Sequence, residues 1–266
     1  MNDTFNERLQ KVSQLKNSKL CIGLDIDPSR MPDSMDKSLS GIESHLKEII
    51  DSTSDISLAY KLNMAFYEQF GFKGYELMEK LVTYIDGRNI TIADGKRGDI
   101  GNTTQKYAIS IFDTIGFDSI TVSPYMGSDS IIPFIQNKEK GAFVLCLTSN
   151  HSAKEIQLFS NENDTIYQFI SRLGDSLNTN NNIGLVVGAT NPSFMEKIRE
   201  TNSLPWLIPG IGAQGGDLEQ SVTISNKNNS IGLINVSRGI IFAGNCSVED
   251  ITDAAESYND NINGYS

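Results

Sequence analysis

The sequence predicts an α/β fold, a (β/α)₈ (TIM) barrel with an extra N-terminal helix, and three observations support this prediction. Short apolar runs rich in β-branched residues recur along the whole chain. Segments with apolar residues at the three-to-four spacing of amphipathic helices lie between these runs. The length of 266 residues is usual for such a barrel in one domain. A doubly wound open sheet is the alternative arrangement of alternating strands and helices.

The apolar runs are the predicted strands. Several of them are almost continuously apolar, as expected for parallel strands that are covered on both faces. In chain order, the predicted strands are Lys19–Asp25, Ile56–Asn63, Asn89–Lys96, Ser119–Pro124, Ala142–Ser149, Ile183–Ala189, Pro205–Gly212 and Gly232–Gly239.

The segments between the strands carry helical patterns. Three are clearest, and they are Phe66–Ile85, Gly101–Ile115 and Val248–Tyr258. The last begins with acidic residues, which stabilise the first turn of a helix. The polar, amphipathic N-terminus predicts one more helix that plugs or flanks the bottom of the barrel.

Two further segments are interpreted as surface structure. Residues 150–159 are expected to form a loop over the barrel mouth, followed by a helix around Thr165–Ser176. The Asn-rich tract Thr179–Asn182 is expected to be a surface loop. Because nothing indicates a second core, residues 1–266 are predicted to form a single domain.

Charge and composition exclude several classes of function. The net charge of −11 disfavours nucleic acids and anionic membranes as partners. No apolar run approaches the roughly 20 residues of a membrane span, and no signal peptide is apparent, so a cytoplasmic protein is expected. Cys21, Cys146 and Cys246 are expected to be buried thiols. His45 and His151 are far apart in sequence, which predicts no metal site and disfavours zinc hydrolases and Ser-His-Asp enzymes.

Polar residues stand where the predicted strands end. In a barrel of this type, the chemistry takes place at the carboxyl ends of the strands. A buried core would not select charged side chains there. The polar residues are Asp25 and Asp27 at the end of the first strand, Lys61 on the second, Asp94, Lys96 and Asp99 at the end of the third, Ser149 at the fifth and Arg238 at the eighth.

Asp94 and Lys96 are two residues apart, so on a strand both side chains point to the same side, into the barrel mouth. Together with Lys61 and Asp99 they form an Asp–Lys–Asp–Lys set that could neutralise itself. A purely structural ion network is therefore the alternative interpretation. Charges presented together from several strand ends are more typical of a site, since they shift pKa values in the way catalysis requires.

Residues 209–217 (PGIGAQGGD) predict a phosphate site. Gly210, Gly212, Gly215 and Gly216 allow the backbone to approach a ligand and to expose its N–H groups. A helix that begins after Gly216 would add its positive end. Arg238, on the neighbouring strand, supplies a cation whose fork geometry suits phosphate oxygens.

These features together resemble the orotidine 5′-phosphate decarboxylase family, in particular its longer bacterial and archaeal type 2 branch. The DGKRGDIGNT stretch is the most specific of the matching motifs, although the family usually has alanine where Gly95 stands. The matching stretches are GLDIDP (23–28), AYKLNMAFYEQFG (59–71), ADGKRGDIGNT (93–103), TVSPYMG (121–127), LTSN (147–150), PGIGAQGGD (209–217) and NVSRGIIFA (235–243).

The resemblance implies catalytic roles for the charged set. Lys96 would be the acid that protonates C6 of the pyrimidine as carbon dioxide leaves, with Lys61 and Asp94 on either side of it. Asp99 would complete the network from the neighbouring subunit. Thr103 would reach the ribose from the same subunit, so the implied active unit is a homodimer.

The resemblance also implies how orotidine 5′-phosphate and the product UMP are held. Asp25 would bind a ribose hydroxyl, Ser149 would contact the pyrimidine, and Gln214, Gly215 and Arg238 would hold the phosphate. No cofactor is expected. Loss of carbon dioxide from C6 leaves electrons in an sp² orbital that cannot delocalise into the ring, and a fixed ammonium can stabilise and then protonate this carbanion.

Three other functions remain to be weighed. A magnesium-dependent decarboxylase or aldolase for sugar phosphates, such as a 3-keto-gulonate-6-phosphate decarboxylase, shares the spacing of Asp94, Lys96 and Asp99. It requires an acidic residue on the second strand, where Lys61 would repel the metal. A Schiff-base aldolase would need a free amine, which acidic neighbours disfavour. The third alternative is a non-catalytic nucleotide-binding barrel.

Overall fold

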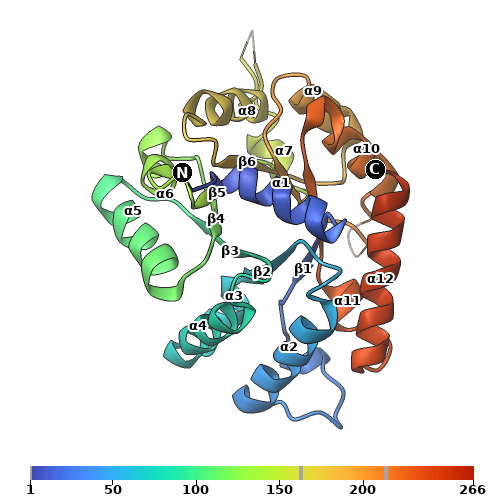
Figure 1. Ribbon diagram of the computed structural model, residues 1–266. Helices are drawn as coiled ribbons and strands as arrows, with labels where there is room; N and C mark the ends of the chain where they lie inside the picture. The colour runs from blue at the N-terminus through green and yellow to red at the C-terminus, as the bar shows by residue number, and fades with distance from the viewer. Residues whose placement is uncertain (1, 162–163, 213–214) are drawn as a thin grey trace.

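The strands of the computed structural model, which describes residues 2–161, 164–212 and 215–266, form a closed parallel barrel in the order β1 to β8 (Figure 1). Strand β8 pairs with β1 and closes the barrel, so the predicted (β/α)₈ barrel is confirmed and the open sheet is wrong. The strands are β1 (Leu20–Gly23), β2 (Ala59–Asn63), β3 (Ile90–Arg97), β4 (Ser119–Val122), β5 (Gly141–Leu147), β6 (Ile183–Val187), β7 (Trp206–Ile208) and β8 (Gly232–Val236).

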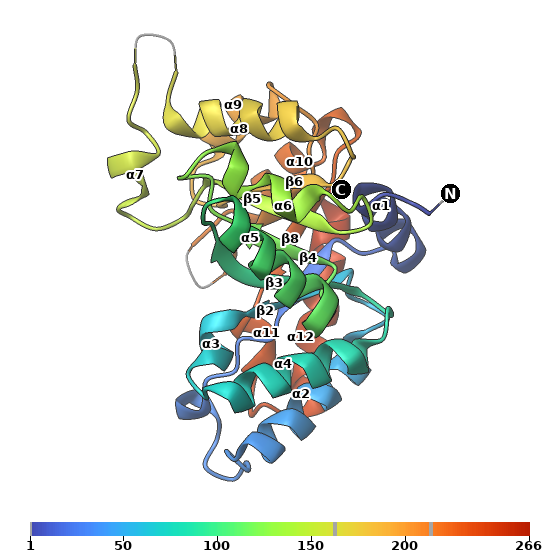
Figure 2. The same ribbon diagram turned by 90° about the vertical axis from the view of Figure 1, so that its left-hand side faces the viewer.

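Helices surround the barrel and cover the outer face of the strands (Figures 1 and 2). The α-helices are α1 (Phe5–Lys16), α2 (Leu39–Thr53), α3 (Met64–Glu68), α4 (Phe72–Ile85), α5 (Gly101–Ala108), α6 (Ile132–Ile135), α7 (Ala153–Ile156), α8 (Ile166–Leu177), α9 (Pro192–Arg199), α10 (Leu218–Ser225), α11 (Arg238–Ile241) and α12 (Val248–Gly264). Shorter 3₁₀ turns are η1 (Pro28–Arg30), η3 (Ser128–Ser130) and η4 (Lys227–Asn229), and η2 (Ile109–Ile115) is a π-helix.

Helix α1 is the predicted extra helix, and it closes the bottom of the barrel (Figure 1). Its Phe5 and Leu9 side chains are fully buried and pack with inward-facing residues of the strands. The Phe5 ring meets Phe143 of β5 edge to face, with 5.9 Å between the ring centroids. Asn6 donates a hydrogen bond to the carbonyl of Ile183 at the start of β6. The amino ends of the strands are therefore covered, and the carboxyl ends remain open for a site.

The predicted helix Phe66–Ile85 is wrong as a single helix. The chain forms α3 and α4 instead, and Gly71 between them has φ 63°. Residues with side chains rarely adopt this left-handed conformation, so the glycine permits the break. The predicted helix Gly101–Ile115 is continuous, but its second half is the π-helix η2.

The tract Thr179–Asn182 is only in part the predicted surface loop. Thr179 is exposed, whereas Asn182 is fully buried. The Asn182 side-chain amide donates to the carbonyls of Ile135, Asn137 and Lys140, with N–O distances of 3.0, 3.1 and 2.9 Å. Asn182 thus ties the loop after α6 to the start of β6, which its polar character alone did not indicate.

The cysteines are buried as predicted. Cys21 lies in β1 and Cys146 in β5, and both are inaccessible, while Cys246 is also buried. Burial raises the pKa of Cys21 to about 12, so this thiol is protonated at neutral pH. Among the described residues, no helix combines the length and the apolar character that crossing a membrane requires.

Candidate active site

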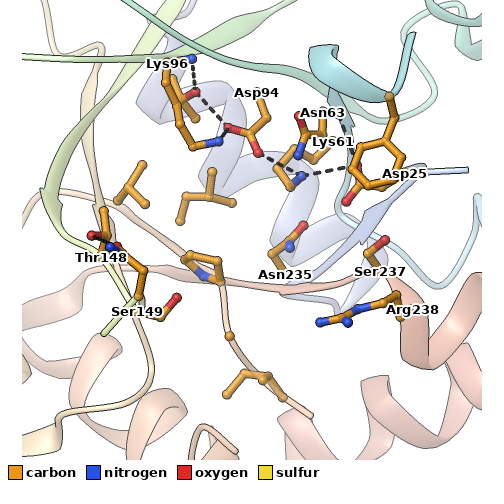
Figure 3. Close-up of a pocket in the computed structure, with 18 of the residues that line it drawn as sticks. Asp25, Lys61, Asn63, Asp94, Lys96, Thr148, Ser149, Asn235, Ser237 and Arg238 are labelled. Atoms are coloured by element: carbon orange, nitrogen blue, oxygen red, sulfur yellow. Dashed lines mark hydrogen bonds and ion pairs between the residues drawn. The ribbon is translucent and has the colours of Figure 1, made fainter. Parts of the chain in front are cut away.

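A pocket of about 720 Å³ opens at the carboxyl ends of the strands (Figure 3). Within the described residues, every strand of the barrel or the loop after it contributes to its lining. Asp25, Lys61, Asp94, Lys96, Ser149 and Arg238 all lie there, as the positions of the predicted strand ends indicated. Because parallel strands bring their carboxyl ends to one face, residues far apart in sequence meet in this pocket.

Four charged side chains form a chain of alternating sign along one side of the pocket (Figure 3). The Nζ atom of Lys61 lies 3.5 Å from Asp25 Oδ1 and 3.1 Å from Asp94 Oδ2. The other Asp94 oxygen, Oδ1, accepts from Lys96 Nζ at 2.6 Å. The order is therefore Asp25, Lys61, Asp94, Lys96, with Asp94 held between two ammonium groups.

The four side chains of this charge network differ sharply in burial. The side chain of Lys61 is 5% exposed and that of Asp94 is 11% exposed, whereas Lys96 is 50% exposed and projects into the pocket. Strand pairing sets this arrangement, since Asn63 of β2 is the register partner of Asp94 and Gly23 of β1 is the partner of Lys61. The buried members are thus held by the barrel wall, and Lys96 is the member of the network most exposed to the pocket.

The network fixes the charges of its buried members. Burial acts to lower the pKa of Lys61, but the negative charges of Asp25 and Asp94 outweigh burial and hold the pKa above its usual value. Burial acts to raise the pKa of Asp94, and here the positive charges of Lys61 and Lys96 outweigh it, so this pKa lies well below its usual value. Lys61 is therefore a cation and Asp94 an anion at neutral pH.

Asp94 and Lys96 converge as predicted, but regular strand alternation is not the reason. The pairing of β3 with β4 shifts between Ala93 and Arg97, and Lys96 in this bulge has φ 47°. Non-glycine residues seldom adopt this left-handed conformation, and such strain is concentrated at functional sites.

A side chain at position 95, where the family that this sequence resembles usually has alanine, would point away from the pocket. A Cβ atom placed on it would lie 2.7 Å from the sulfur of Met64 in α3. The direction of this Cβ agrees with the expectation that a side chain here does not meet the ligand.

The phosphate side of the predicted site lies across the pocket from Lys96 (Figure 3). Arg238 begins α11 directly after β8 and lines the pocket together with Pro209 and Gly210. The positive φ values of Gly210, Gly212 and Gly215, 102°, 74° and 73°, confirm that this segment needs glycine. Gly215 itself is not among the pocket-lining residues, and Gln214 lies outside the described residues.

The predicted helix after Gly216 is present, and the chain's own Asp217 side chain caps its amino terminus. Helix α10 begins at Leu218, and the Asp217 carboxylate caps it by accepting a hydrogen bond from Gln220 N at 2.9 Å. An N-cap side chain satisfies only one or two of the four N–H groups that lack a partner at the start of a helix. Phosphate binding by this helix end stays a prediction.

Asp99 and Thr103 do not reach the pocket of their own chain. Asp99 follows β3 and accepts a hydrogen bond from the neighbouring Ile100 N–H, and Thr103 is exposed on α5. Large apolar side chains are exposed in the same region, among them Ile100 at 60% and Tyr125 at 87%. That Asp99 and Thr103 contribute to the active site of a second subunit stays a prediction.

The segment 150–159 flanks the pocket and contains the single turn α7. Gln157 lines the pocket and clamps the end of β5, because its side chain accepts from Thr148 N and donates to the Thr148 hydroxyl, both at 2.8 Å. The predicted helix that follows is α8. Residues that the sequence did not single out also line the pocket, and they include Arg30, Asn63, Phe66, Thr121 and Asn235.

Comparison with known proteins gives consistent results along the chain. The sequence model of the "Orotidine 5'-phosphate decarboxylase / HUMPS family" matches residues 18–249. Orotidine 5′-phosphate decarboxylase of Dehalococcoides mccartyi (strain CBDB1) is 42% identical over 269 residues, which cover 98% of each chain. The solved structure of Leishmania donovani OMP decarboxylase matches with a TM-score of 0.87 and 34% identity over 98% of each chain. Leishmania donovani UMP synthase matches with a TM-score of 0.89 and 35% identity, over 99% of this chain and 57% of that longer chain.

Proposed function

The chain belongs to the orotidine 5′-phosphate decarboxylase / HUMPS family, and we propose from this that it is a carboxy-lyase that converts orotidine 5′-phosphate to UMP, the last step of de novo pyrimidine nucleotide biosynthesis. The observation that carries the proposal is the alternating network Asp25–Lys61–Asp94–Lys96, which faces Arg238 across one pocket. The charges suit a substrate with a reactive carboxylate at one end and a phosphate at the other.

Lys96 is assigned as the proton donor. As the bond from C6 to the carboxylate breaks, carbon dioxide leaves and the electron pair stays on C6. The Lys96 ammonium stabilises this negative charge and then transfers its proton to C6, which yields UMP and a neutral amine. The half-exposed position of Lys96 allows the amine to recover a proton from water.

Lys61 is unsuited to the same task. It is buried between Asp25 and Asp94, and their charges hold its pKa above the usual value, so it keeps its proton. Its role is to hold Asp94 ionised and to keep the carboxylates of Asp25 and Asp94 in place. Asp94, pinned by Lys61 on one oxygen, presents the other to Lys96 and thereby fixes the direction of the ammonium group.

The remaining substrate contacts follow from the positions of the lining residues. Asp25 uses Oδ1 for the Asn63 N–H, at 3.0 Å, and for Lys61. Within the described part of the chain its Oδ2 has no such partner and is assigned to a ribose hydroxyl. Ser149 is assigned to the pyrimidine and Arg238 to the phosphate. Gln214 and Gly215 remain assigned to the phosphate from the motif alone.

The reaction is proposed to need no cofactor. A divalent metal would be drawn to Asp25 and Asp94, but Lys61 stands between their carboxylates and would repel it. This arrangement disfavours the magnesium-dependent sugar-phosphate decarboxylases. The same carboxylates raise the pKa of Lys61 and keep this amine protonated, which disfavours Lys61 as the nucleophile of a Schiff-base aldolase.

The active unit is proposed to be a homodimer of single-domain chains (residues 1–266) in the cytoplasm. Asp99 and Thr103 would enter the site of the neighbouring subunit and complete its charge network. The exposed apolar side chains beside them, Ile100, Tyr125 and Met126, support a protein interface on this side of the barrel.

The proposal is tested by adding EDTA-treated protein to orotidine 5′-phosphate and following the loss of its absorbance, with UMP identified by chromatography. Stoichiometric conversion to UMP without added metal is expected. Absence of conversion by folded protein would refute the assignment. Conversion that requires added magnesium would refute the cofactor-free mechanism.

A further inference from the structure

Thr121 of β4 connects two members of the charge network through one hydroxyl group. Its Oγ1 atom lies 3.0 Å from Asp94 Oδ1 and 2.9 Å from the backbone nitrogen of Lys96. The residue is 1% exposed and lies at the wall of the pocket. Thr121 begins the TVSPYMG stretch (121–127), but its sequence context indicated no role, because a threonine in a strand is ordinary.

Chemistry fixes the direction of both hydrogen bonds. The Lys96 backbone N–H can only donate, and the ionised Asp94 carboxylate can only accept. Thr121 therefore accepts from Lys96 through a lone pair and gives its one proton to Asp94. With both bonds made, the hydroxyl has no proton left for a substrate, so Thr121 acts through its two partners.

The bond to Lys96 falls at the strained point of the site. Lys96 lies within the β3 bulge with φ 47°, where the regular pairing of β3 with β4 is interrupted. The N–H of Lys96 therefore depends on a side chain for its acceptor, and Thr121 supplies it. Holding this nitrogen holds the left-handed backbone from which the Lys96 side chain starts.

The hydrogen bond from Thr121 to Asp94 also helps to place the Lys96 ammonium, because Asp94 is the partner of that ammonium. Asp94 Oδ1 accepts from both the Thr121 hydroxyl and Lys96 Nζ, while Oδ2 accepts from Lys61. Two groups from neighbouring strands, Lys61 and Thr121, thus fix the plane of the carboxylate. The position of the Lys96 ammonium is set at both ends, by its backbone and by its carboxylate partner.

We propose that Thr121 is a positioning residue for the decarboxylation, in which its single hydroxyl holds the Lys96 backbone and the Asp94 carboxylate in the arrangement that directs the ammonium into the pocket. This inference rests on the proposed function of Lys96 as the proton donor. It predicts an effect on the chemical step rather than on substrate capture, since Thr121 touches neither the phosphate nor the ribose side of the pocket.

The test compares T121V, which keeps the shape and removes the hydroxyl, with T121S, which keeps the hydroxyl. In T121V, kcat is expected to fall by about 100-fold, the size of effect that a misplaced catalytic group produces, with KM and UMP affinity near those of the wild type. T121S is expected to retain most of kcat. The control is T53V, because Thr53 is equally buried in α2 and its hydroxyl contacts Ile49 O and Tyr60 Oη at 2.6 and 2.8 Å, away from the pocket.

Each outcome decides the inference. A wild-type kcat in folded T121V would overturn it, as would equal losses in T121V and T121S, which would indicate packing of the methyl group. If T121V does not fold, T121A replaces it, and the inference then requires loss of kcat in T121A with retention in T121S. If the wild-type protein itself does not convert orotidine 5′-phosphate, the proposed function fails, and the inference fails with it.

Discussion

Lys61 Nζ and Asp94 Oδ2 lie 3.1 Å apart in a buried ion pair that joins β2 to β3 at the mouth of the barrel. Neither charge has much contact with water, so each depends on the other for compensation. The two lysines of the network therefore differ in role. The buried Lys61 maintains the charge of Asp94, and the half-exposed Lys96 faces the ligand.

Removal of the buried ammonium should destabilise the protein strongly. K61M leaves Asp25 and Asp94 beside each other without the cation between them, and the free energy of unfolding is expected to fall by about 3–5 kcal/mol. Urea denaturation measures this change. The control is K80M, which breaks the exposed ion pair of Lys80 with Glu43 and should cost less than about 1 kcal/mol. Equal effects of the two variants would contradict a buried, interdependent network.

The lowered pKa of Asp94 predicts how stability depends on pH. The folded protein keeps Asp94 ionised at pH values where the unfolded chain, with an aspartate pKa of about 3.9, begins to bind a proton. The stability that ionised Asp94 contributes is thus fully present above that pKa and is lost as the pH falls toward the folded-state pKa. The difference in unfolding free energy between wild type and D94N should shrink from pH 6 to acid values. A difference that grows in acid would give the pKa shift the wrong sign.

Arg238 should act on substrate capture. R238A is expected to lower kcat/KM for orotidine 5′-phosphate by about 10- to 100-fold, because a charge-assisted contact to the phosphate is lost. Turnover of orotidine, which lacks the phosphate, should change little. R88A is the matched control, since Arg88 pairs with Asp51 on the surface away from the pocket. Parallel losses for both substrates would show that Arg238 does not recognise the phosphate.

Gly95 and Gly74 should respond very differently to alanine. In G95A the new Cβ meets the flexible end of Met64, so the free energy of unfolding should change by less than about 1 kcal/mol and turnover should persist. In G74A the new Cβ would lie 1.8 Å from the backbone oxygen of Tyr67, which cannot move aside easily. Thermal melting of the two variants checks this contrast. A larger loss in G95A than in G74A would refute the assigned direction of residue 95.

The sequence was sufficient for the barrel and for the charged part of the site. Apolar runs indicate buried strands, and charged residues at the ends of such runs indicate the open mouth of the barrel. Asp25, Lys61, Asp94 and Lys96 meet in one pocket for this reason. The break between α3 and α4 depends on the left-handed backbone of Gly71, which a periodic apolar pattern does not reveal.

Other features of the site depend on three-dimensional detail. The bulge at Lys96 and the hydrogen bonds of Thr121 arise from an offset between β3 and β4, which no local pattern encodes. The Asp217 side chain could equally have left the α10 terminus open, and only its rotamer shows that it caps the helix. The roles proposed for Asp99 and Thr103 depend on a second subunit, since neither residue lines the pocket of its own chain.

The most direct test of the central claim is the turnover of K96A. The account predicts that kcat falls by at least about 100-fold, as for loss of a general acid, while the protein remains folded and still binds UMP, because Arg238 and Asp25 are unchanged. Circular dichroism and UMP titration establish the fold and the binding. Near-normal turnover by folded K96A would contradict the assignment of Lys96 as the proton donor.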